Sequence, residues 1–185
     1  LDKSRIINIM PFSVHIGNTD YINVKMLDVL EGLSRRLNKR TDVRGPVAKH
    51  PAVPEVNAED TITADYLYAK YAEFFKPDDI VVVDSTSSFY GLLLFPLPKG
   101  VKFLSQMLWG AIGWATPAAF GTALAAPDRR VILMTGEGSH QMTVQEISQF
   151  YRYGLKPIIF VLNNQGYLIE RMLSKKLDYC YNDIP

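Results

Sequence analysis

Two short polar turns in this sequence carry the residue types of a metal and phosphate site. The first is 136–139, Gly-Glu-Gly-Ser, and the second is 163–166, Asn-Asn-Gln-Gly. A carboxylate, a side-chain amide and backbone carbonyls near Gly166 form an all-oxygen donor set, which suits Mg²⁺ or Ca²⁺. Free amides at Gly138 and Ser139, next to a helix start, suit a phosphate. Each sequence alone is also that of an ordinary turn, and their occurrence together favours a site.

Both turns follow strands of one predicted βαβ unit. The apolar runs 131–135 and 157–162 are typical of strands that are buried on both faces. Thr143 to Glu146 fits a capping box, and Gly154 stands where a left-handed C-cap belongs, so a helix is expected between the strands. Neighbouring parallel strands bring their carboxyl ends to one edge of the sheet, where open α/β sheets bind ligands. The two polar turns are therefore expected to lie together.

Two further segments are candidates for the same edge. Residues 84–88, Asp-Ser-Thr-Ser-Ser, follow a predicted buried strand at 80–83. Their hydroxyls either bond within their own turn or lie near a bound phosphate, and the sequence leaves both interpretations open. Gly and Ala are frequent from 110 to 126, which lets the backbone approach another surface closely. Simple helix packing through small residues is the alternative there.

The amino-acid sequence around these turns resembles that of the thiamine diphosphate enzymes. A Gly-Asp-Gly followed further along the chain by Asn-Asn is their diphosphate and metal signature. The stretches GSHQMTVQEIS, FVLNNQGYLIER and YNDIP are similar to the 2-oxo acid decarboxylase branch, which includes pyruvate, indolepyruvate and branched-chain 2-keto acid decarboxylases. The similarity runs from about Ile62 to Pro185 and is dense from Trp109 onward. It implies an α/β fold with a parallel sheet flanked by helices, the thiamine diphosphate-binding fold, in a partial chain.

The resemblance implies thiamine diphosphate as cofactor, with Mg²⁺ as its metal and Ca²⁺ as a substitute. The metal ligands would be Glu137, Asn164 and the carbonyl of Gly166. The cofactor contacts would be Gly110, Ile112, Gly136, Gly138, Ser139 and Ser87. In the matching pattern Trp-Gly-x-Ile-Gly-Trp, the Gly110 carbonyl would accept the cofactor's 4′-amino group and Ile112 would wedge beneath the bent cofactor. The charge of the metal would neutralise the diphosphate.

Glu170 and three apolar residues complete the site that the resemblance implies. Glu170 matches the residue that guides CO₂ loss and proton delivery in these decarboxylases, a role that requires burial of the carboxyl group. Without the flanking motif, Glu170 would be a solvated helix residue paired with Lys or Arg. Phe89, Ile169 and Leu173 match positions that line the substrate pocket, so an apolar 2-oxo acid is expected. Core packing is the competing account of these three.

Four positions depart from the family pattern. Glu137 replaces Asp, and its extra methylene displaces the carboxylate group. Mg²⁺ tolerates poor coordination geometry badly. Thr86 replaces Gly, and Leu168 stands where Thr or Val is usual. Residues 174–178, Ser-Lys-Lys-Leu-Asp, replace a His-Gly-Pro turn. These changes bear on cofactor affinity and on closure over the substrate.

The resemblance implies non-oxidative decarboxylation of a 2-oxo acid to an aldehyde and CO₂ by a thiamine diphosphate-dependent carboxy-lyase. In this family a pyrimidine-binding domain of the same or a neighbouring subunit supplies a Glu against the aminopyrimidine ring. No part of the 185 residues resembles that domain. The chain alone is therefore expected to be inactive, as a fragment or as the ordered part of a longer chain. A homodimer or homotetramer is expected.

Two alternative functions remain open. One is a carboligase of the same superfamily, similar to acetolactate synthase, although the Gly-Tyr-Leu-Ile-Glu sequence at 166–170 favours decarboxylation. The other is a degenerate module that keeps the fold for assembly and binds no cofactor. The glutamate at 137 is the best support for this second alternative.

The composition argues against several other classes of function. The sequence is 48% hydrophobic with a formal net charge of +1, which is ample for a core and leaves no basic footprint for nucleic acid or an anionic membrane. Cys180 is the single cysteine and is expected to be a free thiol of a cytoplasmic protein. Residues 1–5 lack the apolar core of a signal peptide. The uncharged stretch 103–127 is diluted by glycines, so a buried cofactor-binding segment is expected rather than a membrane helix.

Three regions are predicted along the chain. Residues 1–40 carry a strand at 5–11 and a helix at 23–37, and they are expected to end a middle domain. Residues 41–59 contain Gly and Pro with scattered charges, which is typical of a linker. Residues 60–185 are expected to form the diphosphate- and metal-binding domain, incomplete at its C-terminus. Its remaining elements are a helix capped by Thr63 that ends before Pro77, and strands at 80–83 and 101–104.

Overall fold

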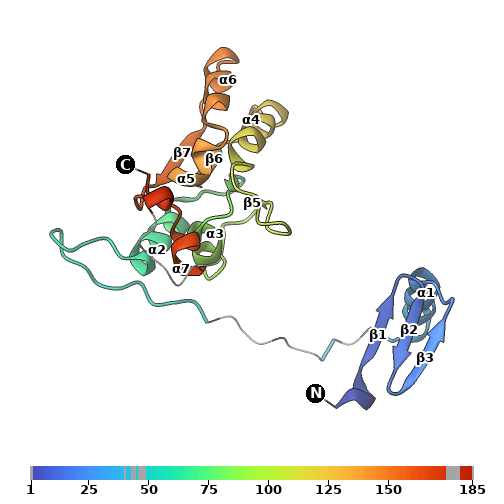
Figure 1. The fold of residues 1–185 in the computed structure, drawn as a ribbon. Helices are drawn as coiled ribbons and strands as arrows, with labels where there is room; N and C mark the ends of the chain where they lie inside the picture. The colour runs from blue at the N-terminus through green and yellow to red at the C-terminus, as the bar shows by residue number, and fades with distance from the viewer. Residues whose placement is uncertain (1, 40, 43–44, 46–48, 174–179, 185) are drawn as a thin grey trace. The chain divides into compact units, whose positions relative to one another are not determined.

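The computed structural model describes residues 2–39, 41–42, 45, 49–173 and 180–184, and it divides the chain into two compact units (Figure 1). Unit 1 covers Leu1–Ala48 and unit 2 covers Lys49–Pro185. The boundary between the units falls within 41–59, the segment that the sequence predicts to be a linker. Each unit is described by itself below.

Unit 1 is a small antiparallel sheet followed by one helix. Its elements are a 3₁₀ turn (Lys3–Arg5), β1 (Ile7–Met10), β2 (Ser13–Ile16), β3 (Thr19–Ile22) and α1 (Met26–Arg36), with strand order β1-β2-β3. The sequence predicts the helix but neither β2 nor β3. Gly17, with a φ of 59°, turns the chain between them in the left-handed conformation that such hairpins need. Because most side chains of β2 and β3 are exposed, the alternation that identifies a half-buried strand is weak.

Unit 2 is an α/β domain built on one four-stranded parallel sheet, as the sequence predicts. The strands are β4 (Ile80–Val83), β5 (Lys102–Ser105), β6 (Val131–Gly136) and β7 (Ile158–Leu162), in the order β5-β4-β6-β7. The helices are α2 (Ala64–Phe74), α3 (Ser87–Leu92), α4 (Ala115–Ala125), α5 (Glu137–Gln141), α6 (Ile147–Arg152) and α7 (Leu168–Leu173), with 3₁₀ turns at Val144–Glu146 and Cys180–Asn182. Each strand lies within one residue of its predicted bounds.

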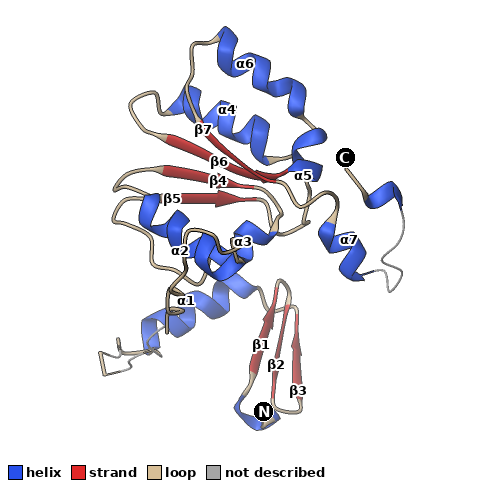
Figure 2. Ribbon diagram, turned by 90° about the vertical axis from the view of Figure 1, so that its left-hand side faces the viewer, coloured by secondary structure: helices blue, strands red, loops and turns tan. Residues whose placement is uncertain are grey.

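Helices cover both faces of this sheet (Figure 2). Successive side chains of a strand point to opposite faces, so the apolar runs of β4 and β6 fill two separate cores. One core joins the sheet to α4 and α6 through Ile80, Val82, Val131, Leu133, Ala115, Ala119, Ala123 and Phe150. The other joins it to α2 and α3 through Val81, Val83, Ile132, Met134, Tyr68, Phe75 and Leu92. The two central strands are therefore packed against helices on both faces.

The segment after β6 differs from the sequence prediction. The predicted capping box at Thr143 and one continuous helix are replaced by α5, a 3₁₀ turn and α6. The Thr143 side chain makes no cap bond, and its hydroxyl donates instead to the carbonyl of Gly113 at 2.7 Å. The capping-box prediction was therefore wrong, because a tertiary acceptor takes the hydroxyl. The prediction for Gly154 is confirmed, since its φ is 66°.

The uncharged stretch 103–127 is part of this domain. It contains most of β5, a turn and α4, whose small residues pack on the sheet. In the part of the chain that the structure describes, no helix is both long and apolar enough to cross a membrane.

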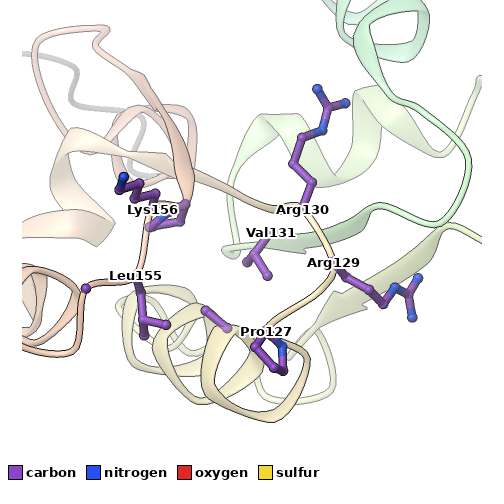
Figure 3. Close-up of a pocket in the computed structure, with 9 residues that line it drawn as sticks. Pro127, Arg129, Arg130, Val131, Leu155 and Lys156 are labelled. Carbon is purple, nitrogen blue, oxygen red and sulfur yellow. The ribbon is translucent and has the colours of Figure 1, made fainter.

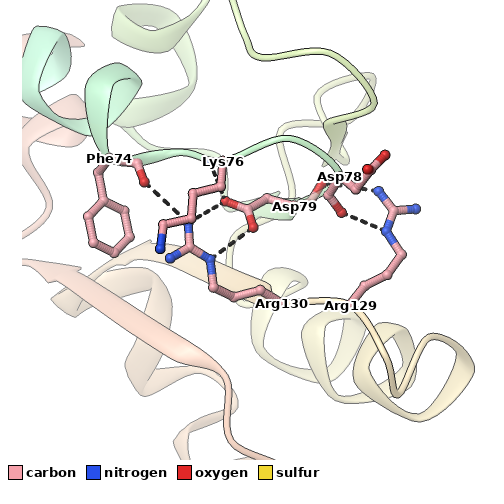
Figure 4. A network of polar contacts seen from close by, with 6 residues as sticks. All are labelled: Phe74, Lys76, Asp78, Asp79, Arg129 and Arg130. Carbon is pink, nitrogen blue, oxygen red and sulfur yellow. Dashed lines mark hydrogen bonds and ion pairs between the residues drawn. The ribbon is translucent and has the colours of Figure 1, made fainter.

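A polar network closes the amino edge of the sheet (Figure 4). Arg130 donates to both carboxylate oxygens of Asp79, at 2.8 and 2.5 Å, and its guanidinium lies 4.9 Å from the ring centroid of Phe74. The Asp79 side chain is only 3% exposed. Arg129 donates to the backbone carbonyls of Asp78 and Gly100. These bonds tie the loop before β4 to the start of β6.

Replacing Arg130 with Met should destabilise unit 2, because Asp79 would stay buried without its cation. We expect the free energy of unfolding at pH 7 to fall by about 3 kcal/mol, measured by urea denaturation. The matched control is Arg152→Met, which removes an exposed arginine at the end of α6 and should cost about 0.5 kcal/mol or less. Equal losses in the two variants would contradict a structural role for the pair.

Acid should remove the same stabilisation from the wild type. Burial raises the pKa of Asp79, but the hydrogen bonds from Arg130 and from the Lys76 N–H outweigh burial and hold the pKa below its ordinary value. Stabilisation by the pair is therefore complete above the unfolded-state pKa of about 3.9 and is lost as pH falls through the folded-state pKa. Below about pH 4, Arg130→Met should lose stability less steeply than the wild type.

Candidate functional site

Three polar segments meet at the carboxyl edge of the sheet. Asp84 follows β4, α5 follows β6 directly, and the turn 163–166 follows β7. Gly136 pairs with Leu162 and Val83 pairs with Met134, so the three strand ends stand side by side. Since β6 lies between β4 and β7, α5 stands between the other two segments.

Glu137, the first residue of α5, reaches across to the turn that follows β7. Its Oε1 accepts the N–H of Asn164 at 3.0 Å and the N–H of Gly166 at 2.7 Å. Hydrogen bonds to a carboxylate are among the strong ones in proteins. The Glu137 side chain thus spans the ends of two strands. The predicted proximity of the two polar turns is confirmed.

The Asn164 side chain lies against the Gly166 carbonyl and the Glu137 carboxylate. Its amide group lies 2.8 Å from the carbonyl oxygen of Gly166 and 3.2 Å from Oε1 of Glu137. With its nitrogen turned toward these atoms, the amide donates two hydrogen bonds. With its oxygen turned toward them, three oxygens converge as a hard cation requires. The three residues predicted to be metal ligands therefore lie within one cluster, and a half-turn of one amide changes its chemistry.

Two glycines of these turns are required by close packing. A Cβ at Gly166 would lie 2.0 Å from the Asn182 carbonyl oxygen, and the φ of Gly166 is 147°. A Cβ at Gly138 would lie 2.6 Å from the ring of Tyr167. Arg171 donates to the carbonyls of residues 165 and 182 and pairs with the carboxylate of residue 183. The segment 180–184 thus supports the turn that carries the Gly166 carbonyl.

The turn predicted to receive the aminopyrimidine ring lies before α4. Gly110 is exposed with a φ of 62°, and Ile112 is half-buried. The neighbouring Trp109 is 82% exposed. The Ser85 hydroxyl donates to the Ala111 carbonyl at 3.2 Å, which ties this turn to the segment after β4. The exposed Gly110 and Trp109, beside the anchored backbone of Ala111, are features that a ring-binding surface would need. The contacts of this turn with a cofactor stay a prediction.

The hydroxyl segment after β4 has a local structural role. The hydroxyl oxygen of Thr86 accepts the N–H of Ser88 at 3.3 Å and caps α3. The position where a Cβ would stand on Gly136 lies 3.4 Å from the Thr86 methyl group, an ordinary contact. Thr86 is therefore accommodated beside Gly136 without a clash. Ser87 is exposed in the first turn of α3, and its cofactor contact stays a prediction.

Glu170 and the predicted pocket residues differ in their surroundings. Glu170, Ile169 and Leu173 are exposed on α7, which begins two residues after Gly166. The described residues do not bury Glu170, so this part of the chain does not supply the burial that its predicted role requires. Phe89 is half-buried and packs on Phe103, with ring centroids 6.0 Å apart, so core packing accounts for its position. The departure at 174–178 lies outside the described residues.

Asp84 is a functional candidate that the sequence does not single out. Its side chain accepts N–H groups of Ser85 at 2.8 Å, Gly113 at 3.2 Å and Ala115 at 3.4 Å. The residue is 1% exposed, and burial raises the pKa of Asp84 while these hydrogen bonds oppose the rise. An Asp directly after a fully buried apolar strand was the available signal. Its partners come from a turn about thirty residues away, which no local pattern reveals.

His140 on α5 is also half-buried near Asp84. Its Nδ1 lies 3.3 Å from the hydroxyl oxygen of Thr116. Burial lowers the pKa of His140, and the Asp84 charge only partly opposes this, so the neutral imidazole is favoured near pH 7. With a neutral His140, no side chain of α5 carries a positive charge.

A cavity of about 420 Å³ lies away from this edge (Figure 3). Its lining includes Pro127, Val131, Leu155 and Lys156, from the start of β6 and the segment before β7. The guanidinium of Arg130 points away from the cavity and is engaged by Asp79. Arg129 also lines the cavity, and no residue of the polar cluster is among its lining residues.

Comparison with known proteins identifies the domain. Residues 85–181, more than half of the chain, match the family described as thiamine pyrophosphate enzyme, C-terminal TPP binding domain. The chain belongs to this family. The matched residues include α5 and the turn 163–166, and the match begins directly after Asp84. The family and the fold expected from the sequence are thereby confirmed.

Several relatives of this chain are named alpha-keto-acid decarboxylase. The chain is 37% identical over its whole length to the proteins so named from Mycobacterium ulcerans (strain Agy99) and Mycobacterium avium (strain 104). It covers 33% of each, so it spans about a third of the length of these curated relatives. The structure of a thiamine diphosphate-dependent 4-hydroxybenzoylformate decarboxylase from Rhodococcus jostii RHA1 superposes with a TM-score of 0.68 at 27% identity. That match covers 92% of this chain and 32% of the other.

The residues at the carboxyl edge fit a diphosphate and its metal. The Glu137 carboxylate, the Asn164 amide and the Gly166 carbonyl meet in one cluster, and with the amide oxygen turned inward they would offer the donor chemistry of Mg²⁺ or Ca²⁺. Gly138 and Ser139 lie in the first turn of α5, where N–H groups lack intrahelical acceptors. Among the described residues, no group of three His, Cys, Asp or Glu could hold a metal, so the mixed oxygen cluster is the candidate site.

Replacing Glu137 with Gln should weaken metal binding, because the side chain keeps its length but loses its charge. We expect the Mg²⁺ affinity of the full-length protein, measured by Mg²⁺ titration of thiamine diphosphate binding, to fall by at least about tenfold. The matched control is Glu146→Gln on the 3₁₀ turn before α6, which should leave the affinity unchanged. Unchanged affinity in Glu137→Gln would remove this carboxylate from the metal site.

Proposed function

We propose that this chain supplies the diphosphate- and metal-binding half of the active site of a thiamine diphosphate-dependent 2-oxo acid decarboxylase. The reaction would convert a 2-oxo acid to an aldehyde and CO₂ without oxidation. The single observation that carries the proposal is the oxygen cluster of Glu137, Asn164 and Gly166 beside the first turn of α5. The names of the relatives support the reaction class.

In this proposal the cluster would hold a Mg²⁺ ion that binds the diphosphate. The N–H groups of Gly138 and Ser139 would donate to phosphate oxygens, and Gly136 would leave room for the phosphate beside them. The Gly110 carbonyl would accept the amino group of the ring, and Ile112 would support the bent cofactor from below. Bound thiamine diphosphate supplies an electron sink for the pair left by departing CO₂.

Glu170 would act on the substrate from α7. It lies four positions after Gly166, so the turn that holds the metal also sets the start of its helix. Its carboxyl group would move a proton at the reacting carbon, which requires that neighbouring chain segments bury it. The exposed Ile169 and Leu173 on the same helix would contact an apolar 2-oxo acid, and Ser87 would approach the diphosphate from α3.

The rest of the site would come from other parts of the protein. A pyrimidine-binding domain of the same or a neighbouring subunit would supply the Glu that faces the aminopyrimidine ring, in a homodimer or homotetramer. Residues 1–40 would end a middle domain and 41–59 would link it to the domain that begins at 60. We place the protein in the cytoplasm, and we expect this chain alone to be inactive.

Two alternative functions, a carboligase and a degenerate module, must be distinguished from the decarboxylase by experiment. Acetolactate synthase-like carboligases share the cofactor fold, and the exposed face of α7 does not distinguish them from decarboxylases. A degenerate module without cofactor would keep Glu137 only for the hydrogen bonds that it accepts from Asn164 and Gly166. Reaction products and cofactor binding separate these functions.

The test is aldehyde release by the full-length protein, supplied with thiamine diphosphate and Mg²⁺. Pyruvate, phenylpyruvate and 4-methyl-2-oxopentanoate are the substrates, and we expect at least one to yield its aldehyde. Glu170→Gln should lower kcat about 100-fold with unchanged cofactor affinity, because proton transfer by a positioned carboxyl contributes at least this much. Glu146→Gln serves as the matched control and should keep the wild-type kcat.

The contrary results are distinct from one another. Formation of acetolactate without any aldehyde would show that the protein is a carboligase and not a decarboxylase. Absence of both products and of cofactor binding would indicate the degenerate module.

A further inference from the structure

Gly113 is held from both sides by two side chains, one directly after β4 and the other after α5. Its N–H lies 3.2 Å from each carboxylate oxygen of Asp84, directly after β4. Its carbonyl accepts the Thr143 hydroxyl at 2.7 Å, from the segment that follows α5. One buried glycine therefore connects the end of β4, the turn before α4 and the helix that follows β6.

Asp84 is a firmly anchored end of this connection. Besides Gly113, its carboxylate accepts the N–H groups of Ser85 and Ala115 and lies 3.4 Å from the hydroxyl of Thr135 on β6. The first residues of α4 have N–H groups without intrahelical acceptors, and the α4 N-cap residue makes no side-chain cap bond. Asp84 supplies that acceptor and a negative charge at the positive end of the helix. Since all its partners are donors, an amide cannot replace the carboxylate without a mismatch.

The turn lies directly against α5 at Gly113. The φ of Gly113 is 82°, and a Cβ there would stand 2.5 Å from Cβ of Met142 and 3.3 Å from the carbonyl oxygen of Ser139. Any side chain at this position would push the turn 110–112 away from the motif 137–139. Gly113 thus lies in close contact with the end of α5, and its two hydrogen bonds hold the turn at this contact.

We propose that Asp84 and Thr143 are positioning residues, which act through Gly113 to fix the spacing between the turn 110–112 and the motif 137–139. This inference rests on the proposed function, in which the turn receives the ring of thiamine diphosphate and the motif receives its diphosphate. A ligand that must contact both segments at once depends on their spacing. A ligand that contacts only the motif does not.

That difference gives a test with two ligands on the full-length protein. Thiamine diphosphate with Mg²⁺ needs both segments, whereas inorganic pyrophosphate with Mg²⁺ needs only the motif and the metal cluster. Thr143→Val keeps the shape of the half-buried side chain and removes its hydroxyl. Calorimetry should show thiamine diphosphate binding weakened by about 10- to 100-fold, with pyrophosphate binding changed less than about twofold. Thr143→Ser, which restores the hydroxyl, should recover most of the loss.

The chain offers a matched control for this substitution. The hydroxyl of Thr122 on α4 donates to the Ala118 carbonyl at 2.7 Å, the same kind of bond at the same length, within one helix. Thr122→Val should leave the affinities for both ligands unchanged. Asp84→Asn should reproduce the selective loss of Thr143→Val. If Asp84→Asn does not fold, as judged by its thermal unfolding, the Thr143 variants decide the question.

The outcomes separate this inference from the proposed function. Failure of the wild type to bind thiamine diphosphate would overturn both. Wild-type binding together with equal loss of both ligands in Thr143→Val would show that the bond supports the phosphate motif itself, and would overturn only the spacing. Unchanged affinity for both ligands would also overturn it.

Discussion

The carboxylate of Glu137 joins the ends of two parallel strands, and the candidate site depends on this junction. Its two hydrogen bonds fix the turn after β7 against the start of α5. The junction exists because β6 and β7 pair in register up to Gly136 and Leu162, so that both strands end at the same level. A slip of one residue would turn every side chain of a strand to the opposite face. The apolar cores on both faces therefore determine where Glu137 can reach.

A similar arrangement, a carboxylate that accepts backbone N–H groups, occurs at the end of the neighbouring strand β4. Asp84 follows β4 as Glu137 follows β6, and each carboxylate accepts backbone N–H groups from a turn distant in sequence. The difference lies in exposure. Asp84 is buried and accepts hydrogen bonds in the interior, whereas Glu137 is half-buried and lies beside an exposed Asn164. In the proposed function only the second carboxylate would contact a bound cation.

The sequence predicts the sheet well because its signals are local. Fully buried parallel strands appear as short apolar runs, and glycines at 154 and 166 mark backbone conformations that other residues rarely adopt. It predicts the proximity of Glu137 and Asn164 because parallel topology brings strand ends together. Strands β2 and β3 escape prediction because their side chains are mostly exposed.

Tertiary hydrogen bonds account for the other failures. Thr143 has the sequence context of a helix cap, but the carbonyl of Gly113, thirty positions away, takes its hydroxyl. Asp84 is inconspicuous in a run of small polar residues until the turn before α4 folds over it. The exposure of Glu170 is likewise invisible in the sequence, since the motif around it matches the decarboxylases whether or not its neighbours are present.

The central claim is that a divalent cation at the Glu137 cluster holds a diphosphate. The most direct measurement is a calorimetric titration of thiamine diphosphate into the full-length protein, first with Mg²⁺ and then after removal of the metal by EDTA. We predict saturable binding with Mg²⁺, its loss after EDTA treatment, and its return when Mg²⁺ or Ca²⁺ is added back. Binding that persists without a divalent cation, or no binding under either condition, would contradict the account.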